Sequence, residues 1–596
     1  MNATTSGIMA ALDPSRVTPQ RVKVGTMRTR GRPHRGRTFL ALVLSAVLGI
    51  PLLFGLYTAF DLFGLVGGLG FVIVLGLIVS VAWIVHLART FAPEIGAFFR
   101  SLGAGIAEGF AAQASLVSLG RRLAPVGRSV RRRLDTSTRQ GLFLTVGVII
   151  TGLLASWFGS LTAQVLHHGV ITQIDVRVAS LSDSLHNAGP VRASTFFTEL
   201  GGAGVRIPLS ILIFGVLWFR RPGLRPFIGL VAVLVLGPAI SDLVRIIVRR
   251  PRPWVGALAL PGSYSFPSGH AAGAAAAFGY LAYLGIRATR TLRAQVVIAL
   301  LAATLIIGVA YSRVVLGFHW TSDVVAGTVL GLAVAAATAT WVGLAQWRRR
   351  DTHRWSVMWQ GAAIALAVGL GALTLVRAVR DPQYAPALRP LPITRLAEAS
   401  VGPETMARLP LRSETVTGRA MEPATLVFLG TRAQVEAAFA AAGWSEAGPL
   451  NIHTVLRLYS AGIHHTADPT APVTPAFLAG RPQDMAFELA VDAGSVSKRH
   501  HTRVWASGFA LSDGTPIWVA TASLDDRVEI KFPVPIPNHH IAPAIDTERD
   551  FIARSLAATG LVKAETRIQA VPPEFGTNAA GDPFFTYGIA VVIDLR

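Results

Sequence analysis

Long apolar stretches constrain the fold of this chain more than any other feature. A helix needs about 20 consecutive apolar residues to cross the hydrocarbon core of a bilayer. Runs of this kind occupy residues 38–60, 62–88, 141–166, 205–219, 224–248, 268–286, 294–311, 321–345 and 358–379. Only 15% of the 596 residues are charged, against about 25% in soluble proteins. The sequence therefore predicts an all-α polytopic membrane bundle of about nine transmembrane helices.

The position of the basic residues explains the net charge of +22. Residues 1–379 contain 36 Lys/Arg and 11 Asp/Glu, a net charge of +25, whereas residues 380–596 contain 19 and 22, a net charge of −3. Because the basic residues are scattered over loops that flank apolar runs, we expect no nucleic-acid partner. The chain has no cysteine, which excludes disulfides, thiolate metal sites and a cysteine nucleophile.

Loop charges also predict the orientation. Basic residues precede the apolar run at 38–60, which is too long for a cleaved signal peptide. Residues 89–140 and the loops at 220–225, 287–293 and 348–354 are basic as well. With nine helices all of these lie on the cytoplasmic side, so we expect a plasma-membrane protein with an extracytoplasmic C-terminal domain. Residues 89–140 fit either an amphipathic helix on the membrane surface or a connecting helix packed on the bundle.

One loop breaks this charge pattern. Residues 245–267 lie on the outer side by the same count, yet they contain Arg245, Arg249, Arg250 and Arg252. Four arginines on the disfavoured side indicate an anionic ligand. The alternative is that one helix is miscounted and that this loop is cytoplasmic.

Three short segments follow or precede the apolar runs on that outer side. The residues that stand out in them are Arg245, Arg252 and Pro253, then Pro267, Ser268, Gly269 and His270, then Ser312, Arg313, His319 and Asp323. The directions of the four helices place all three segments on the same side. The sequence therefore predicts that they converge into one site.

The residue types in these segments suit a phosphoryl group. Arginine presents a planar fork of donors that matches phosphate oxygens, so Arg245, Arg252 and Arg313 can hold a dianion together. Ser268 and Gly269 open a helix, where free N–H groups and the helix dipole favour an anion. The missing Cβ of Gly269 also permits close approach of the backbone.

Two histidines in the segments supply reactive groups. Imidazole can act as nucleophile, base or acid near neutral pH. His319 and Asp323 are four residues apart at the start of a helix, so the carboxylate can hold one ring nitrogen as N–H. The other nitrogen of His319 is then a lone pair available to phosphorus. A lone histidine at a membrane interface is more often structural, so the prediction depends on the joint spacing.

These motifs resemble the three-part signature of the type 2 phosphatidic acid phosphatase (PAP2) superfamily, over roughly residues 170–345. The sequence departs from the family only at Arg245, where a lysine is usual. The resemblance implies that His319 is the nucleophile that forms a phosphohistidine, that Asp323 orients it, and that His270 is the acid and base. It also implies that Arg245, Arg252, Ser268, Gly269 and Arg313 bind the phosphate, with Pro253, Pro267 and Ser312 as supporting motif residues.

The same residues bear on cofactor and substrate. A two-metal mechanism needs clustered carboxylates, and near the motifs only Asp242 and Asp323 are acidic, so we expect a metal-independent hydrolase without a cofactor. A phosphate site between apolar helices suits a lipid whose tail stays in the bilayer. Phosphatidate, phosphatidylglycerol phosphate and polyprenyl diphosphates fit equally well. The oligomeric state stays open.

After residue 379 the composition changes. Residues 380–410 are rich in proline and resemble a linker. Strands are predicted at residues 425–429, 454–459, 486–491, 502–509, 516–521 and 588–593. A capping box of Thr431 and Gln434 predicts a helix that ends near Gly443, and a second helix is expected from 546 or 547 to 560. We therefore expect a soluble α+β domain at 411–596.

Three segments of this domain, at 480–484, 499–505 and 539–550, resemble the LssY-type C-terminal domain, for which the resemblance implies no reaction. His-His pairs at 464, 500 and 539 raise the possibility of a metal or phosphate site. Hydrogen-bonded or surface histidines are the alternative, since adjacent residues on a strand point to opposite faces and a pair gives one ligand at most.

The sequence thus predicts an integral-membrane lipid phosphate or diphosphate phosphatase. Its expected parts are a basic cytoplasmic N-terminus (1–37), a membrane hairpin with a basic amphipathic segment (38–140), a PAP2-like core (141–350), a last transmembrane helix (351–379), the linker (380–410) and the C-terminal domain (411–596). Two alternatives remain. One is an enzyme like the vanadate-dependent haloperoxidases, and the other is a protein that binds or transports lipid phosphates without hydrolysing them.

Overall fold

The computed structural model describes most of the chain from Arg139 onward. The described residues are 139–184, 188–218, 224–253, 264–289, 291–344, 354–380, 393–448, 473–491, 498–531, 536–578 and 581–596, with 454, 457 and 470. The apolar runs at 38–60 and 62–88 and the basic segment up to residue 138 lie outside them. Nine transmembrane helices therefore stay a prediction.

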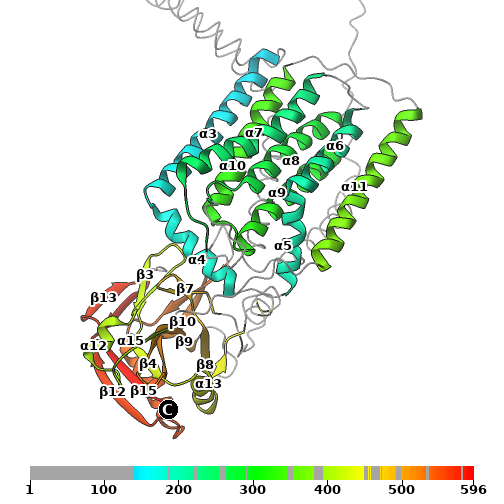
Figure 1. Cartoon of the computed structure of the whole chain (residues 1–596). Helices are drawn as coiled ribbons and strands as arrows, with labels where there is room; N and C mark the ends of the chain where they lie inside the picture. Colours follow the sequence, from blue (N-terminus) through cyan, green and yellow to red (C-terminus); the bar gives the residue numbers. More distant parts are fainter. Residues whose placement is uncertain are drawn as a thin grey trace, which may run out of the picture. The chain divides into compact units, whose positions relative to one another are not determined.

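The first part of the described chain is helical (Figure 1). A π-helical turn, η2 (Arg139–Phe143), leads into α3 (Leu144–Leu166), α4 (Val170–Ser184), α5 (Ala188–Gly201), α6 (Ala203–Trp218), α7 (Leu224–Val248), α8 (Gly269–Ala288), α9 (Leu292–Val315), α10 (Thr321–Gly343) and α11 (Arg354–Arg380). Figure 1 shows α3, α7, α8, α9 and α10 running alongside one another. The predicted helical bundle is present.

Four stretches of the described helices are long and apolar enough to cross a membrane, at Gly141–Leu166, Leu224–Val248, Leu292–Val315 and Thr321–Gly343. The short run expected at 205–219 is part of a broken helix, because α5 and α6 meet at Gly202 with a bend of 65° and together pass the same test. The sequence had not indicated the first half of this pair, which is interrupted by polar residues.

The contact between α8 and α10 positions the site. The α8 residues from Ala271 to Ala277 are all fully or almost fully buried. Across from them, a Cβ added at Gly331 of α10 would lie 2.7 Å from Cβ of Ala275 and would overlap the Ala272 carbonyl. Small residues at such positions let two helix backbones approach closely. The N-terminal ends of both helices are thereby adjacent, and the Ser268 N–H donates to the Asp323 carbonyl at 2.9 Å.

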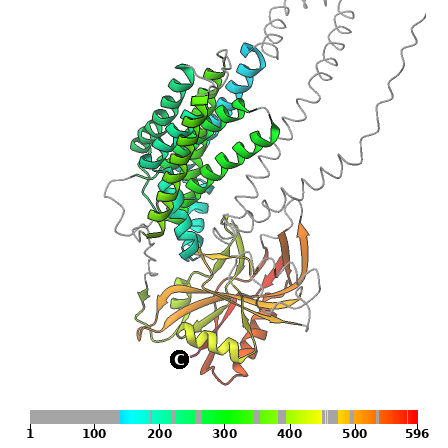
Figure 2. The same ribbon diagram turned by 90° about the vertical axis from the view of Figure 1, so that its right-hand side faces the viewer.

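The second part of the described chain is built on a nine-stranded mixed sheet (Figure 2). Its main path runs in the order β12 (Ala564–Gln569), β15 (Ile589–Asp594), β4 (Leu426–Leu429), β10 (Pro516–Lys531), β9 (Arg499–Ala510), β8 (Met485–Ala490) and β5 (Ser445–Glu446). β1 (Thr394–Arg395) pairs with β9, and β11 (Ile536–Ile541) pairs with β10. All neighbours are antiparallel except β1 with β9 and β15 with β4.

Two smaller sheets and three helices complete this domain. One sheet has the order β3 (Ala420–Pro423), β2 (Arg412–Glu414), β6 (Phe477–Leu478) and β7 (Arg481–Pro482), and the other pairs β13 (Glu574–Thr577) with β14 (Pro583–Thr586). The helices are α12 (Pro403–Arg408), α13 (Arg432–Ala441) and α15 (Ile545–Ala557). A helical core followed by a strand-rich α+β domain is therefore what the sequence predicted.

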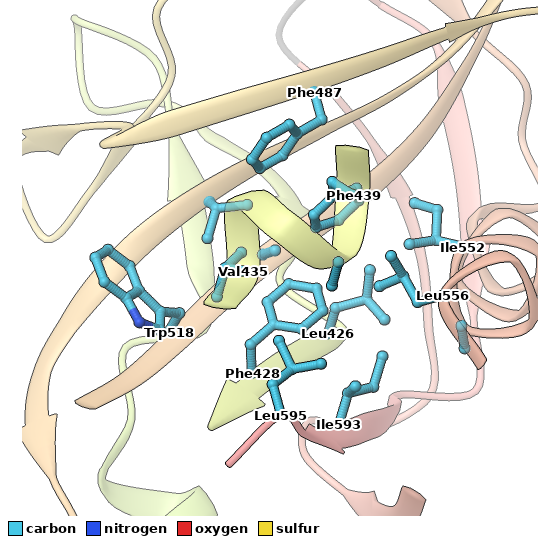
Figure 3. Close-up of a cluster of buried hydrophobic side chains, with 14 of the residues drawn as sticks. Leu426, Phe428, Val435, Phe439, Phe487, Trp518, Ile552, Leu556, Ile593 and Leu595 are labelled. Carbon is cyan, nitrogen blue, oxygen red and sulfur yellow. The ribbon is translucent and has the colours of Figure 1, made fainter. Parts of the chain in front are cut away.

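The central strand β4 divides the domain core into two layers. Leu426 and Phe428 face one layer, whereas Val427 and Leu429 face the other, as the alternation of a strand requires. Figure 3 shows the first layer, in which Phe439 of α13 stacks on Phe487 of β8 with ring centroids 4.2 Å apart. Both faces of this strand are thus buried.

Local expectations for this domain can be compared with its elements. The capping box exists as predicted, since the Thr431 N–H donates to Oε1 of Gln434 at 2.8 Å. Five expected strands correspond to β4, β8, β9, β10 and β15. The expectation at 454–459 differs, because both described residues there, Thr454 and Arg457, are helical. The expected linker also differs, because β1 and α12 lie within 380–410 and Leu396 and Met406 are buried in the second core layer.

The α8–α10 contact leads to a stability prediction. We expect Gly331→Ala to destabilise the protein by about 1–3 kcal/mol, since the added methyl overlaps the α8 backbone. The matched control is Gly152→Ala on α3, where a Cβ meets nothing within 4 Å and alanine favours the helix by about 0.5–1 kcal/mol. Thermal melting in detergent measures both variants. Equal melting temperatures for the two would contradict the proposed packing constraint.

Candidate active site

The three motif segments meet at one end of the helical core. They extend from the C-terminal ends of α7 and α9 and from the N-terminal ends of α8 and α10. Direct bonds join them: Arg252 donates from Nη1 to the Phe318 carbonyl at 2.8 Å, and Arg245 from Nη2 to the Pro267 carbonyl at 3.3 Å. The convergence expected from helix directions is therefore present in the structure.

His319 is buried in this cluster, with 3% of its surface exposed. Its Nε2 lies 3.3 Å from Nη1 of Arg252, and its Nδ1 lies 3.5 Å from Oδ2 of Asp323. The second distance is at the limit of hydrogen bonding, and Nδ1 has no well-formed bond to a described residue. This arrangement favours the tautomer with the proton on Nδ1 and a lone pair on Nε2.

The electrostatic surroundings keep this imidazole neutral. Burial lowers the pKa of His319 well below its ordinary value, and the charges of Arg313, Arg252 and Arg245 lower that pKa further. A neutral ring at physiological pH keeps its nucleophilic lone pair.

Asp323 is fully buried and fixed from two sides. Oδ2 accepts the backbone N–H of Trp320 at 3.0 Å, and Oδ1 accepts Nη1 of Arg250 at 2.8 Å. The carboxylate therefore faces His319 in one orientation only.

Arg250 and Asp175 belong to this arrangement but were missed as site residues. Nη2 of Arg250 lies 2.8 Å from Oδ2 of Asp175, and Oδ1 of Asp175 accepts the Ser322 N–H at 2.8 Å. Asp175, on α4, is fully buried. One guanidinium thus bridges two buried carboxylates. The sequence signals that could have indicated them were the position of Asp175 between two apolar runs and that of Arg250 two residues before Arg252.

The phosphate-binding candidates of the first two motifs lie against each other. A Cβ at Gly269 would lie 2.8 Å from Nη2 of Arg245, so only glycine leaves this guanidinium its place. Nη1 of Arg245 also pairs with Oδ1 of Asp242 at 2.9 Å. The Ser268 hydroxyl is buried without a partner among the described residues. An unsatisfied buried donor beside an arginine is suited to an anionic ligand.

Arg313 approaches from the end of α9. Its Nη1 donates to Oγ1 of Thr198 at 2.6 Å, and its guanidinium carbon lies 4.1 Å from the centre of the Phe318 ring. Ser312 is fully buried and donates to the Val309 carbonyl at 2.7 Å. Thr198, on α5, is another contact that the motifs did not indicate.

The proline positions support the loops. The Pro267 carbonyl accepts the hydroxyl of Ser241 at 3.2 Å, and Pro253 is buried. His270 lies in the first turn of α8. Its Nε2 is close to Gly202, since a Cβ added to that glycine would lie 3.9 Å away. The α5–α6 break therefore borders the second histidine.

The histidine pairs of the C-terminal domain make protein contacts. His500 bonds through Nδ1 to both Glu548 oxygens at 2.8 and 2.9 Å, while His501, on the opposite face of β9, lies with Nδ1 3.1 Å from Oδ1 of Asp525. His540 bonds to Asp582. The pair at 464 lies outside the described residues, and within the described part no three His, Asp or Glu side chains are grouped as a metal site.

His501 is one member of a buried ionic cluster between β8, β9 and β10. Arg499 lies 2.8 Å from Glu488 and 3.1 Å from Asp525, and all three side chains are at most 6% exposed. Burial raises the pKa of Glu488 to about 8. The ion pairs offset part of the desolvation of these charges.

The site thus combines apolar helices with a buried histidine, a half-buried histidine, a buried aspartate and several arginines. Residues 226–347 match the PAP2 superfamily, and residues 406–589 match the LssY C-terminus. The helical core therefore resembles the PAP2 superfamily, and the strand-rich domain resembles the LssY C-terminus.

Two individual proteins are similar to parts of this chain. Phosphatidylglycerophosphatase B of Bacillus subtilis (strain 168) is 27% identical over 178 residues, which cover 29% of this chain and 86% of that protein. The crystal structure of a transmembrane PAP2 type phosphatidylglycerolphosphate phosphatase from Bacillus subtilis is 25% identical and covers 31% of this chain and 91% of that chain, with a TM-score of 0.29. The sequence similarity supports a membrane phosphatase.

The carboxylate bridge leads to a kinetic prediction. Asp175→Asn removes one charge held by Arg250 and should lower kcat at least about 10-fold, since hydrogen bonds between charged groups contribute about 1.5–3 kcal/mol. Because both side chains act on Asp323 together, the double variant Asp175→Asn/Arg250→Gln should lose less than the product of the single losses. Steady-state kinetics on all three variants measures the coupling. Strictly multiplicative losses would argue against a shared network.

The surroundings of His319 lead to a pH prediction. A folded-state pKa below 6.5 keeps the ring neutral at pH 6.5, so the acid limb of kcat/KM should lie below that value. Arg252→Gln removes one of the charges that lower the pKa, so the remaining activity should have its acid limb at higher pH. Both statements are tested by measuring kcat/KM between about pH 4 and 8, an interval that spans the ordinary range of histidine pKa values. A wild-type limb above pH 6.5 would rule out the neutral buried nucleophile.

Proposed function

We propose that this protein is an integral-membrane phosphatase that hydrolyses lipid phosphates or diphosphates through a phosphohistidine intermediate. The observation that carries the proposal is the position of His319 between Asp323 and Arg252, 3.5 Å and 3.3 Å away. One neighbour supports the Nδ1 proton and the other marks where a phosphate oxygen binds. This is the arrangement that an in-line attack by Nε2 requires.

In the first chemical step, Nε2 of His319 attacks phosphorus while the bond between phosphorus and the leaving oxygen breaks. Arg245, Arg252 and Arg313 balance the charge of the transferring oxygens, together with the Ser268 hydroxyl and the N–H groups at the start of α8. His270 gives its proton to the leaving oxygen, so the dephosphorylated lipid departs neutral at that atom.

The second step releases phosphate. His270, now unprotonated, accepts a proton from water as the water oxygen attacks the phosphohistidine. The bond between phosphorus and Nε2 breaks, and inorganic phosphate leaves with His319 neutral again. Arg250 and Asp175 hold Asp323 in place throughout. None of these steps requires a metal ion, so we propose that chelators leave the activity intact.

The location of the site supports a lipid substrate. It lies at the ends of helices whose outer residues are apolar and exposed, such as Leu243, Ile246 and Ile247 of α7. A phosphate head group can reach the arginines while its tail remains between such surfaces. We propose that the site faces the outer side of the plasma membrane, as the loop charges predict. The name of the Bacillus relative makes phosphatidylglycerol phosphate one candidate substrate.

The direct test is substitution of the proposed nucleophile. We expect His319→Ala to lower phosphate release from a panel of lipid phosphates and diphosphates by at least about 10³-fold, because it removes the covalent route. The same variant should still bind the lipid in a pull-down with labelled vesicles. The exposed His167→Ala is the matched control and should keep full activity.

The same assay separates the alternatives. Unchanged phosphate release by His319→Ala would exclude its role as nucleophile. Lipid binding without turnover by the wild type would favour a binding or transport protein. Vanadate should inhibit phosphate release by a phosphatase. If the protein instead brominates a substrate when vanadate is added, a haloperoxidase-like enzyme is favoured.

A further inference from the structure

Arg206 is a buried arginine that none of the three motifs contains. It lies in the first turn of α6, next to the break at Gly202, and only 5% of its surface is exposed. Its Nη1 donates to the Gly201 carbonyl at 2.9 Å, whereas its Nε is buried without a partner. Among the described residues no carboxylate forms an ion pair with it. A buried charge inside a membrane domain is costly without a counter-charge.

The local fold makes room for this guanidinium. A Cβ added at Gly273 of α8 would overlap the guanidinium group, so Arg206 occupies the space that the missing side chain of Gly273 leaves. The bend at Gly202 frees the Gly201 carbonyl, which Arg206 satisfies. That hydrogen bond accounts for one N–H donor of Arg206. It does not explain why a positive charge, rather than a neutral donor, occupies the position.

The position of Arg206 relative to the histidines supplies an explanation. Gly273 is three residues after His270 on α8, so both lie on one face of that helix. At the same break, a Cβ at Gly202 would lie 3.9 Å from Nε2 of His270. Arg206 therefore borders the histidine proposed to protonate the leaving group.

We infer that Arg206 and the N-terminus of α6 bind a second phosphate of the substrate, the one that stays on the leaving lipid. This inference rests on the proposed function, because it takes His270 as the proton donor to the leaving oxygen. Free N–H groups at a helix start and an arginine fork both suit phosphate oxygens. The favoured substrates then carry two phosphates, as polyprenyl diphosphates and phosphatidylglycerol phosphate do.

The charge balance of the site agrees with this assignment. Arg250 is neutralised by Asp175 and Asp323, and Arg245 is paired in part with Asp242. Arg245, Arg252 and Arg313 face the transferring phosphate, which carries up to two negative charges. Arg206 adds a positive charge that phosphatidate, with a neutral diacylglycerol leaving group, would leave uncompensated. A second phosphate supplies the missing counter-charge.

The test compares substrates with one and two phosphates. In detergent-purified protein, kcat/KM is measured for a polyprenyl diphosphate, for phosphatidylglycerol phosphate and for phosphatidate. Arg206→Gln keeps a donor for the Gly201 carbonyl and removes the charge. We expect it to lower kcat/KM for at least one two-phosphate lipid about 10- to 100-fold, the effect of one charged hydrogen-bond partner, with phosphatidate changed less than about 3-fold.

A second variant and a control variant test whether the loss is specific to the guanidinium of Arg206. Gly273→Ala displaces the guanidinium without changing its charge and should reproduce the same selective loss. Arg192→Gln, an exposed arginine on α5, should change no substrate. If only one of the two-phosphate lipids is affected, that lipid identifies the source of the second phosphate.

The outcomes separate this inference from the proposed function. Equal losses on all three lipids, or none on any, would overturn the second-phosphate site while leaving the phosphatase intact. No hydrolysis of any lipid by the wild type would instead overturn the proposed function itself.

Discussion

Asp323 is the point at which the three segments of the site are joined. Its backbone carbonyl accepts the N–H of Ser268, its Oδ1 accepts Arg250, and its Oδ2 accepts the N–H of Trp320 and faces His319. One buried residue thus links the end of α7, the start of α8 and the start of α10. The arrangement depends on α8 and α10 being close, which the small residues along their contact permit. The close packing of α8 and α10 therefore also determines the geometry of the site around Asp323.

The charges of the site follow from this junction. Buried arginines are tolerated in an apolar core only where anions compensate them. Arg250 is compensated by Asp175 and Asp323, and Arg245 is paired with Asp242. Burial, together with the charges of Arg313, Arg252 and Arg245, lowers the pKa of His319 and keeps its ring neutral.

Much of this organisation could be predicted from the sequence. Apolar runs predicted the positions of α3, α7, α9 and α10, and the directions of the four flanking helices predicted the convergence of the motifs. The contributions of Asp175 and Thr198 could not be predicted, because α4 and α5 contain polar residues and do not form apolar runs. Arg206 lies in the predicted run at 205–219, but the break at Gly202 that places it beside the site was not indicated by the sequence. In the C-terminal domain, β1 and α12 were mistaken for linker, since β1 pairs with a strand more than a hundred residues away and Met406 of α12 is buried in the domain core.

The covalent intermediate is the central claim, and trapping it tests that claim most directly. Protein mixed with a lipid substrate labelled on the transferring phosphate is denatured within the first turnover, and the label is located by peptide mapping. The account predicts an acid-labile, base-stable label on His319 that is absent in His319→Ala. Label on another residue, or rapid turnover without any labelled protein, would contradict it.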